Sequence, residues 1–369
     1  MSMLVKRPIV GLFLDRAIVD QLKRNETSRY YRLNKLIEAA AATGVTLVVF
    51  SIKDISFNPD RLGGYRYNWK LRRWVAANLI RPDILYDRFV GFGAAQRQKA
   101  NHIRYELNRR GIKKINSRHF FDKWEVYKIL SRSDDLAHYL PLTKQLQSIR
   151  DLEEMFGRSK NLFLKNAVGG RGKQVIKVTR LSSNNYAYSY FNNRLFSGQV
   201  KTLSALIKVI HFVTGKKNTI IQQAVELIKE NNRVVDLRGE LQRNGRGKLE
   251  IVAVIVRLGS EYSPIATHGH SLTFEKYFAR LNYSKAAFLA LKRKLAGFLI
   301  AVYDCMEREY GPFGEIGIDF GIDSNGKVWL FECNAKSMKV SLCKCANSST
   351  VTKAFLNPML YAKYLYSQR

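Results

Sequence analysis

Acidic residues, cysteines and long apolar runs are all scarce in this chain of 369 residues, and each scarcity excludes a class of protein. The four cysteines are unevenly spaced and predict no disulfide framework, while Cys343 and Cys345 lie too close together for the usual paired zinc ligands. No apolar run approaches the length of a membrane-spanning helix, so we expect no membrane span. The early charged pair Asp15 and Arg16 favours a first strand over a signal peptide. We therefore expect a protein of the reducing cytoplasm.

The shortage of acids leaves a large positive charge. Lys and Arg outnumber Asp and Glu by 62 to 30, which gives a formal net charge of +32. Such a charge predicts affinity for polyanions, whether nucleic acid, an acidic polymer or an acidic protein layer. The basic residues are spread along the chain and are especially dense in residues 61–73 and 104–114. No zinc-finger, basic-zipper or RNA-recognition signature accompanies them, so a basic, well-solvated surface explains them equally well.

The first part of the chain has the pattern of a small α/β domain. A hydrophobic content of 46% and 12% aromatics predict a folded globular protein, and the length allows two or three domains. Residues 8–15 and 45–50 read as buried strands, and residues 30–43 between them read as a helix that ends at Gly44. This β-α-β order predicts a parallel sheet with a right-handed crossover. No Gly-x-Gly-x-x-Gly follows the first strand, which argues against a dinucleotide site.

The strongest local pattern is a hairpin over residues 315–336. Two apolar strands flank residues 323–326, Asp-Ser-Asn-Gly, a turn sequence that favours a β-hairpin. The first strand carries Asp319, and the second carries Glu332 and Asn334 on one face. Two carboxylates and an amide oxygen suit Mg²⁺, whose remaining positions would be filled by water and phosphates. A solvated surface hairpin is the alternative, and the apolar residues around each acid disfavour it.

A second pattern is a lysine before a glycine-rich turn. Residues 161–165 read as a strand that ends at Lys165, residues 169–173 are Gly-Gly-Arg-Gly-Lys, and a strand over 175–178 follows. Strand, glycine-rich turn and strand form a flap whose backbone amides can close over phosphates. A glycine-rich turn is most often just a hairpin. Its weight here comes from Lys165 and from the acidic hairpin downstream.

The remaining expectations concern secondary structure. Residues 69–79 read as a helix or a strand pair, and residues 94–110 as a basic helix. The polar stretch 181–200 reads as a surface loop or insert. We expect the other elements as follows: strands at 83–88, 218–225, 234–241 and 249–257, and helices from Asp122, at 151–156, 203–212 and 286–309 and from about 348.

Several stretches occur in the order found in ATP-grasp proteins. They are Asp-Lys-Trp-Glu-Val-Tyr at 122–127, Lys165 with its glycine-rich turn, Gln222-Gln223, Asp-Leu-Arg at 236–238, Asn-Gly-Arg-Gly at 244–247, and Asp319 followed by Glu-Cys-Asn at 332–334. From about residue 8 to about 340 the chain most resembles the YheC/YheD-type, endospore coat-associated family of the ATP-grasp superfamily. The resemblance implies an α/β fold, α+β in the ATP-grasp part. A Rossmann-like α/β domain over 1–117 would precede an ATP-grasp domain over 118–369, with subdomains 118–224 and 225–369.

The resemblance also implies roles for individual residues around ATP. Lys123 and Lys165 would meet the α and β phosphates as point charges. The backbone amides of the flap would cover the β and γ phosphates, and Asp236 would lie near the ribose or hold Arg238. The other nucleotide contacts would be Gly169, Gly170, Arg171 and Gly172 in the flap and Gln223, Ala224 and Val225 at the adenine edge.

Further residues would serve the metal and the reaction. Asp319, Glu332 and Asn334 would hold one or two Mg²⁺ ions that bridge the phosphates. Arg238 or Arg257 would neutralise charge on the phosphoryl group in transfer. Lys336 would lie near the γ-phosphate or the substrate acid.

By this resemblance the protein would be an ADP-forming, ATP- and Mg²⁺-dependent carboxylate–amine ligase that works through an acylphosphate. Two alternatives stay open: a non-catalytic basic spore coat protein that keeps the ATP-grasp fold, and a polyanion- or nucleic-acid-binding protein. The expected partners are ATP, a carboxylate and an amine that the sequence does not identify, and acidic polymers or coat proteins. The expected location is the mother-cell cytoplasm or the spore coat.

Three stretches depart from the family pattern. Lys336 is followed by Ser-Met-Lys in place of a Lys-Pro-Gly-like turn, and Asn166 stands where a proline is usual. Residues 266–270, Ala-Thr-His-Gly-His, stand where an Asn and a Gly pair are expected near the substrate. His268 and His270 are therefore either specificity residues or signs of divergence.

Overall fold

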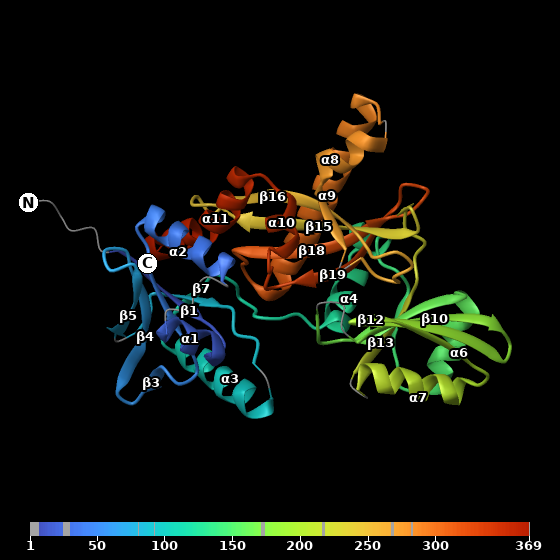
Figure 1. Ribbon diagram of the computed structural model, residues 1–369, viewed down its shortest axis with the longest axis horizontal. Coiled ribbons are helices and arrows are strands. Elements are labelled where there is room, and N and C mark those ends of the chain that lie inside the picture. The colour runs from blue at the N-terminus through green and yellow to red at the C-terminus, as the bar shows by residue number, and fades with distance from the viewer. Residues whose placement is uncertain are drawn as a thin grey trace, which may run out of the picture.

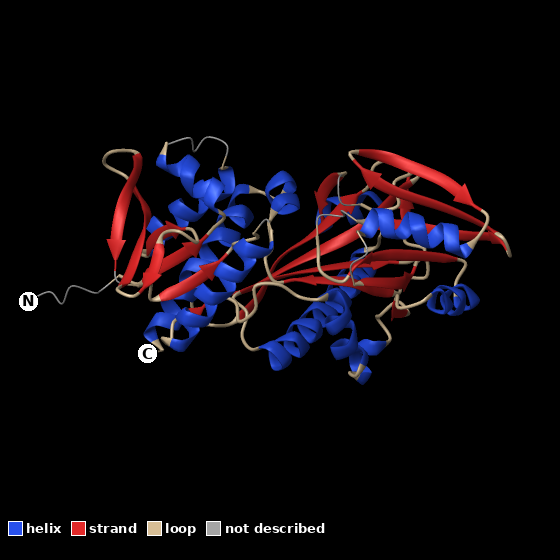
Figure 2. Ribbon diagram, turned by 90° about the horizontal axis from the view of Figure 1, so that it is seen from below, coloured by secondary structure: helices blue, strands red, loops and turns tan. Residues whose placement is uncertain are grey.

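Three β-sheets form the framework of the molecule. The computed structural model describes residues 7–24, 30–79, 81–91, 93–170, 174–215, 218–266, 269–281 and 283–368. Figure 1 shows the sheet of the N-terminal third at one end, the sheet of β8–β13 at the other, and the sheet of β14–β19 between them. Figure 2 shows helices packed against all three sheets. The expected mixed α/β fold is therefore confirmed.

The N-terminal sheet has a parallel centre. β1 (Ile9–Phe13) pairs in parallel with β2 (Thr46–Phe50) and with β6 (Ile84–Asp87), as the β-α-β pattern predicts. α2 (Tyr31–Thr43) ends at Gly44, which adopts a left-handed φ of 68° that costs glycine least. Of residues 69–79, expected as a helix or a strand pair, 69–72 form a turn and 73–79 form one strand of an antiparallel pair. The other elements are α1 (Arg16–Lys23), β3 (Ile55–Phe57), β4 (Asp60–Asn68), β5 (Arg73–Leu79), α3 (Ala94–Arg109) and β7 (Lys113–Lys114).

The second sheet is antiparallel and has the strand order β12-β11-β10-β9-β13-β8. Leu152 from α6 and Leu206 and Ile210 from α7 are fully buried in the core of this sheet. The loop expected over residues 181–200 is wrong, because most of this stretch forms two paired strands, at 185–192 and 194–200. The elements are β8 (Thr143–Gln145), α6 (Ile149–Arg158), β9 (Asn161–Asn166), β10 (Val175–Ser182), β11 (Asn185–Asn192), β12 (Arg194–Val200), α7 (Leu203–Thr214) and β13 (Thr219–Gln223).

The third sheet carries the acidic hairpin in its strand order β17-β16-β15-β18-β19. α9 (Lys285–Tyr310) packs on this sheet through Leu295, Phe298 and Leu299. The strands are β14 (Lys229–Glu230), β15 (Arg233–Arg243), β16 (Leu249–Leu258), β17 (His270–Thr273), β18 (Glu315–Ile322) and β19 (Val328–Asn334). The helices are α4 (Lys123–Ser131), α5 (Asp134–Ala137), α8 (Phe274–Phe278), η1 (Ala279–Leu281), α10 (Val340–Cys345) and α11 (Ser348–Ser367).

The C-terminal helix α11 packs against the N-terminal part of the chain. Phe355 and Met359 of α11 share a hydrophobic core with Leu36 and Ile37 of α2 and with Val10 of β1. The C-terminal helix therefore covers the N-terminal sheet (Figure 1). Within the described residues, no helix has the length and apolar character needed to cross a membrane.

Candidate functional site

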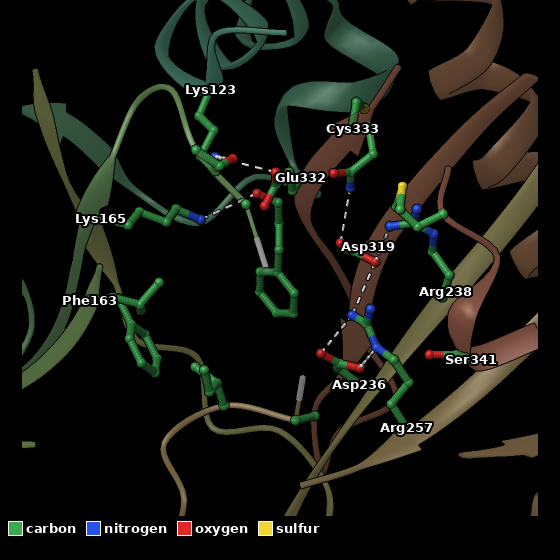
Figure 3. Close-up of a pocket in the computed structure, with 18 of the residues that line it drawn as sticks. Lys123, Phe163, Lys165, Asp236, Arg238, Arg257, Asp319, Glu332, Cys333 and Ser341 are labelled. Atoms are coloured by element: carbon green, nitrogen blue, oxygen red, sulfur yellow. Dashed lines mark hydrogen bonds and ion pairs between the residues drawn. The ribbon is translucent and has the colours of Figure 1, made fainter. Parts of the chain in front are cut away.

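A cavity of about 1370 Å³ lies where the three sheets meet. Phe163 and Lys165 reach it from β9, Asp236 and Arg238 from β15, and Glu332 from β19 (Figure 3). The residues that follow β6 line its N-terminal side. The cavity therefore brings together charged residues that lie far apart in the sequence.

The hairpin of β18 and β19 supplies the predicted metal ligands. Asp319 pairs in register with Glu332, and Gly317 pairs with Asn334. The Asn334 amide donates a hydrogen bond of 3.1 Å to Asp319 Oδ2. The intervening Cys333 lies on the other face, where burial raises the pKa of its thiol. The hairpin thus gathers two carboxylates and an amide, as the sequence predicts.

Two arginines from the neighbouring strands neutralise Asp319. Arg238 Nη1 lies 2.8 Å and Arg257 Nη2 3.0 Å from Asp319 Oδ1. Arg238 is in register with Asp319 across β15 and β18. Burial alone would raise the pKa of Asp319, but Arg238 and Arg257 outweigh it and lower the pKa. The carboxylate is therefore ionised at neutral pH.

Asp236 forms a bidentate ion pair with Arg257, through distances of 2.5 and 2.9 Å. Burial raises the pKa of Asp236 despite this partner. Asp236 thus pairs with Arg257 in place of Arg238, and the alternative, a position near the ribose, stays a prediction. Arg238 instead bonds to Glu240 at 3.1 Å and reaches Asp319, and its guanidinium fills the space over Gly317 where a Cβ would collide with it.

The two predicted phosphate-binding lysines face the hairpin from the other side of the cavity (Figure 3). Lys165 is buried and donates to Gln222 Oε1 at 2.9 Å, and burial lowers the pKa of its ammonium to about 8. Lys123 Nζ lies 3.2 Å from Glu332 Oε1 and donates to the Gly169 carbonyl at 2.8 Å. Lys123 opens α4, whose N-cap is Asp122. Both lysines therefore lie within the same site as the acids.

Of the other predicted nucleotide contacts, some line the cavity and some lie outside the described residues. Gly169 and Gly170 line the cavity, while Arg171 and Gly172 lie outside the described residues. The three predicted adenine contacts, Gln223, Ala224 and Val225, also line it. The Ala224 N–H is engaged, because it donates to the Asn161 carbonyl at 3.0 Å. An adenine edge would therefore have to use other backbone groups of this segment.

Lys336 turns toward the N-terminal sheet, and of the two histidines the structure describes His270. Lys336 lines the cavity, but its Nζ lies 3.4 Å from Asp87 Oδ1 and donates to the Phe89 carbonyl. It therefore points to the N-terminal sheet. His270 lies in β17 and does not line the cavity, and His268 lies outside the described residues.

Sequence reasoning assigned no role to three polar residues that hold these side chains. Gln222 accepts from Lys165, and Ser337 donates to Glu240 Oε1 at 2.7 Å. Glu240, Gln222 and Ser337 are all buried. A polar residue at a buried strand position was the available signal for Gln222 and Glu240, since such groups need partners.

The residues present fit a magnesium ion only in part. Among the described residues, no group of three or more His, Cys, Asp and Glu side chains is arranged to hold a metal. The hairpin offers hard oxygen donors of the type Mg²⁺ prefers, but only two of them are charged. The donor set therefore fits Mg²⁺ that arrives with phosphate oxygens as further ligands.

Comparisons with known proteins agree with this geometry. A family model for YheC/D like ATP-grasp proteins matches residues 111–365. The endospore coat-associated proteins YheD and YheC of Bacillus subtilis (strain 168) are 26% and 22% identical over 89% and 91% of this chain, and over 72% and 92% of their own lengths. The crystal structure of a D-alanine–D-alanine ligase from Bacillus anthracis superposes with a TM-score of 0.57 at 12% identity and covers 98% of this chain and 99% of that one. At this identity the likeness shows a common fold.

Proposed function

The chain belongs to the YheC/D-like ATP-grasp family, and from this premise we propose that it is an ADP-forming ligase that joins a carboxylate to an amine. One observation carries the proposal: Lys123 and Lys165 face Asp319, Glu332 and Asn334 across one cavity. A nucleoside triphosphate and its metal require both: cations for the phosphates and hard oxygen donors for the metal. The similarity to solved ligases supports the same choice.

In this proposal the lysines bind phosphate oxygens. Lys165 is buried and, within the described part of the chain, donates to an amide oxygen and a carbonyl oxygen and to no carboxylate. A bound phosphate would compensate its charge and raise its pKa from about 8. Lys123 would leave Glu332 for phosphate, and the glycines at 169 and 170 let the chain approach closely.

Asp319, Glu332 and Asn334 would hold magnesium, whose bound form supplies charge neutralisation for phosphoryl transfer. Arg238 and Arg257 already share one oxygen of Asp319. Both guanidiniums would thus lie close to the transferred group, where fixed positive charge stabilises the transition state without reorganisation.

The proposed chemistry has two steps. A carboxylate oxygen of the acid attacks the γ-phosphorus, the bond to the β–γ bridging oxygen breaks, and ADP leaves with that oxygen. The amine then attacks the carbonyl carbon of the acylphosphate, phosphate leaves, and one amine proton goes to solvent. A closed cavity favours this route because water would otherwise hydrolyse the acylphosphate.

The test is to incubate the protein with Mg-ATP and pools of amino acids and small acids, and to follow nucleotides by mass spectrometry. We expect ADP and phosphate to form in a pool-dependent manner, with a new amide in the same pool. AMP and pyrophosphate, or no nucleotide turnover in any pool, would contradict the proposal.

A second candidate function is a basic spore coat protein that keeps the fold without turnover. The observation that favours it is the net charge of +32, which exceeds what binding one nucleotide needs. The relatives named endospore coat-associated are consistent with it. In this case Mg-ATP would give no product, while acidic polymers would still bind.

A further inference from the structure

The charges of the cavity divide into two regions. The nucleotide region is lined by six cations and five acids: Lys123, Lys165, Lys177, Lys229, Arg238 and Arg257, and Glu226, Asp236, Glu240, Asp319 and Glu332. Four of these acids, Asp236, Glu240, Asp319 and Glu332, each have a cation within 3.2 Å. All five acids that line the cavity therefore lie in this region, where they offset most of the positive charge before Mg-ATP enters.

The N-terminal side of the cavity is different. It is lined by five cations that we call the cationic wall, Arg88, Arg97, Arg104, Lys336 and Lys339. Among the described residues, two acids pair with the wall. Asp87 forms ion pairs with Arg104, at 2.6 Å, and with Lys336, at 3.4 Å. Glu315 forms ion pairs with Arg88, at 2.6 Å, and with Lys339. Within the described part of the chain Arg97 makes no ion pair, and it is exposed.

One face of α3 presents part of this wall. Arg97, Asn101 and Arg104 are spaced at i, i+4 and i+7, so they share a side of the helix, and all three line the cavity. Arg104 Nη1 donates to Asn101 Oδ1 at 2.9 Å. The helix therefore offers two guanidiniums and an amide to whatever occupies this side of the cavity.

The cationic wall is fixed to the β18–β19 hairpin, which carries the proposed magnesium ligands. Arg88 Nη2 donates to the Ser337 carbonyl at 2.7 Å, so the segment after Asn334 is held against the end of β6. The wall thus begins beside the point at which the transferred phosphate would lie. Ligands of open α/β sheets bind at the carboxyl ends of parallel strands, and the wall occupies that end of β6.

A half-buried histidine lies on the same side of the cavity as the cationic wall. His119 lines the same side of the cavity, and burial together with Arg104 lowers the pKa of its imidazole to about 3. A further cation is thus disfavoured there. An anion in contact with the cationic wall would compensate the positive charges that Asp87 and Glu315 leave unbalanced.

We propose that the acid activated by this enzyme carries at least one further negative group beside its reacting carboxylate, and that Arg97 and Arg104 bind that group. This inference rests on the proposed ligase function. A monocarboxylate would offset one charge at the phosphate and leave the wall unsatisfied. Both a small polycarboxylic acid and an acidic peptide carry such an additional negative group. The experiment below distinguishes these two kinds of substrate.

The test compares acids of matched size and different charge. Glutarate is set against butyrate, and triglutamate against triglutamine, with ADP formation followed at fixed Mg-ATP. We expect the multiply charged member of one pair to have a KM at least about tenfold lower, since charge-assisted hydrogen bonds are of that strength. Preference within the first pair would identify a small acid, and preference confined to the second would identify an acidic peptide.

Arg97→Gln removes a charge of the wall from an exposed position, and Lys99→Gln removes one from an exposed position of the same helix that does not line the cavity. We expect Arg97→Gln to raise the KM for the preferred acid about tenfold with kcat and the KM for ATP unchanged. Lys99→Gln should change each constant less than twofold. Equal effects of the two variants would overturn the inference and assign the attraction to the overall charge.

A binding experiment without nucleotide tests the anion site independently of the ligase proposal. Calorimetry without nucleotide measures how tightly the protein binds triglutamate and triglutamine when no turnover is possible. Selective binding of triglutamate that Arg97→Gln weakens and Lys99→Gln does not would support the anion site even if no acid yields ADP. Equal binding of both peptides, or equal KM values within both acid pairs, would overturn the inference while leaving ligase activity intact.

Discussion

At the scale of single residues, each predicted carboxylate ligand already has a positive partner. Glu332 contacts Lys123, and Asp319 contacts Arg238 and Arg257. Paired charges are required because an isolated buried carboxylate is costly. Binding of Mg-ATP would therefore exchange partners within the site, with lysine moving to phosphate and magnesium to carboxylate.

Glu332→Gln tests this exchange because it keeps the shape of the side chain and removes its charge. We expect the melting temperature without ligand to stay close to that of the wild type. The rise in melting temperature on adding Mg-ATP should be lost, since ligand stabilisation depends on affinity for the native state. Thermal unfolding with and without Mg-ATP measures both quantities.

Glu309→Gln on α9 is the matched control, because it removes the same charge from an exposed position outside the cavity. It should retain the full Mg-ATP shift. If the wild type itself shows no Mg-ATP shift, the ligase hypothesis fails and the coat-protein hypothesis replaces it.

His119 gives a pH dependence of stability. The pKa of its imidazole is lowered to about 3 in the folded protein, against an ordinary value of 6.5. Between these values the unfolded chain binds the proton and the folded protein does not, so stability falls as the pH decreases from about 6.5 toward 3. The contribution is on the order of a few kcal/mol.

Urea unfolding of the wild type and of His119→Gln at several pH values between 7 and 4 isolates this contribution. The wild type should lose more stability on acidification than the variant, because only the wild type carries this titrating imidazole. Parallel losses in the two proteins would show that His119 is protonated as easily when folded as when unfolded.

At the scale of elements, the β18–β19 hairpin depends on its turn. Asp323 Oδ1 accepts the backbone N–H groups of Asn325 and Lys327, each at 2.9 Å. Its other oxygen accepts from Trp329 Nε1 at 2.8 Å. The turn therefore holds the register that sets Asp319 opposite Glu332.

Asp323→Ala should lower the free energy of unfolding by about 1–3 kcal/mol, because it leaves these donors without their acceptor. Asp323→Asn keeps an acceptor oxygen and should cost less. Chemical denaturation measures both. Since Asp323 does not line the cavity, both variants should keep the Mg-ATP shift, and loss of that shift would mean that the turn acts on the site.

Most elements were predictable where one pattern dominates. The apolar runs of β1 and β2, the hairpin turn after β18 and the αL glycine after α2 are local signals. β11 was mistaken for a loop because its composition is polar. Tyr186, Tyr188 and Tyr190 alternate with other residues along β11, and alternation indicates a strand even where few residues are aliphatic.

The site was predictable only in part. The sequence spacing within one hairpin predicts that Asp319, Glu332 and Asn334 converge, because a turn links their strands. The partners of Asp319 come from β15 and β16, and those pairings depend on non-local register. Glu315 is a clearer case, since Arg88 and Tyr86 contact it from more than 220 residues away. No local pattern carries such contacts.

At the scale of the whole molecule, the first and third sheets are joined by buried polar contacts. Tyr86 and Arg88 bond to Glu315 at 2.8 and 2.6 Å, and Asn116 bonds to the Glu315 backbone. α11 adds an apolar contact between the same two parts. The domain limits at residues 117 and 224 stay predictions. The contacts nevertheless show that the cationic wall and the β18–β19 hairpin belong to one packed unit.

The net charge of +32 predicts a property of the entire surface. If polyanions bind through the summed field, affinity for duplex DNA and for polyglutamate should fall steeply with added salt and show little sequence preference, because counterion release dominates. Titrations at several salt concentrations, with two unrelated DNA sequences, measure both properties. Glu332→Gln should bind like the wild type, since one charge among so many changes the field little. A complex that resists salt and selects one sequence would contradict a field effect and favour a specific nucleic-acid site.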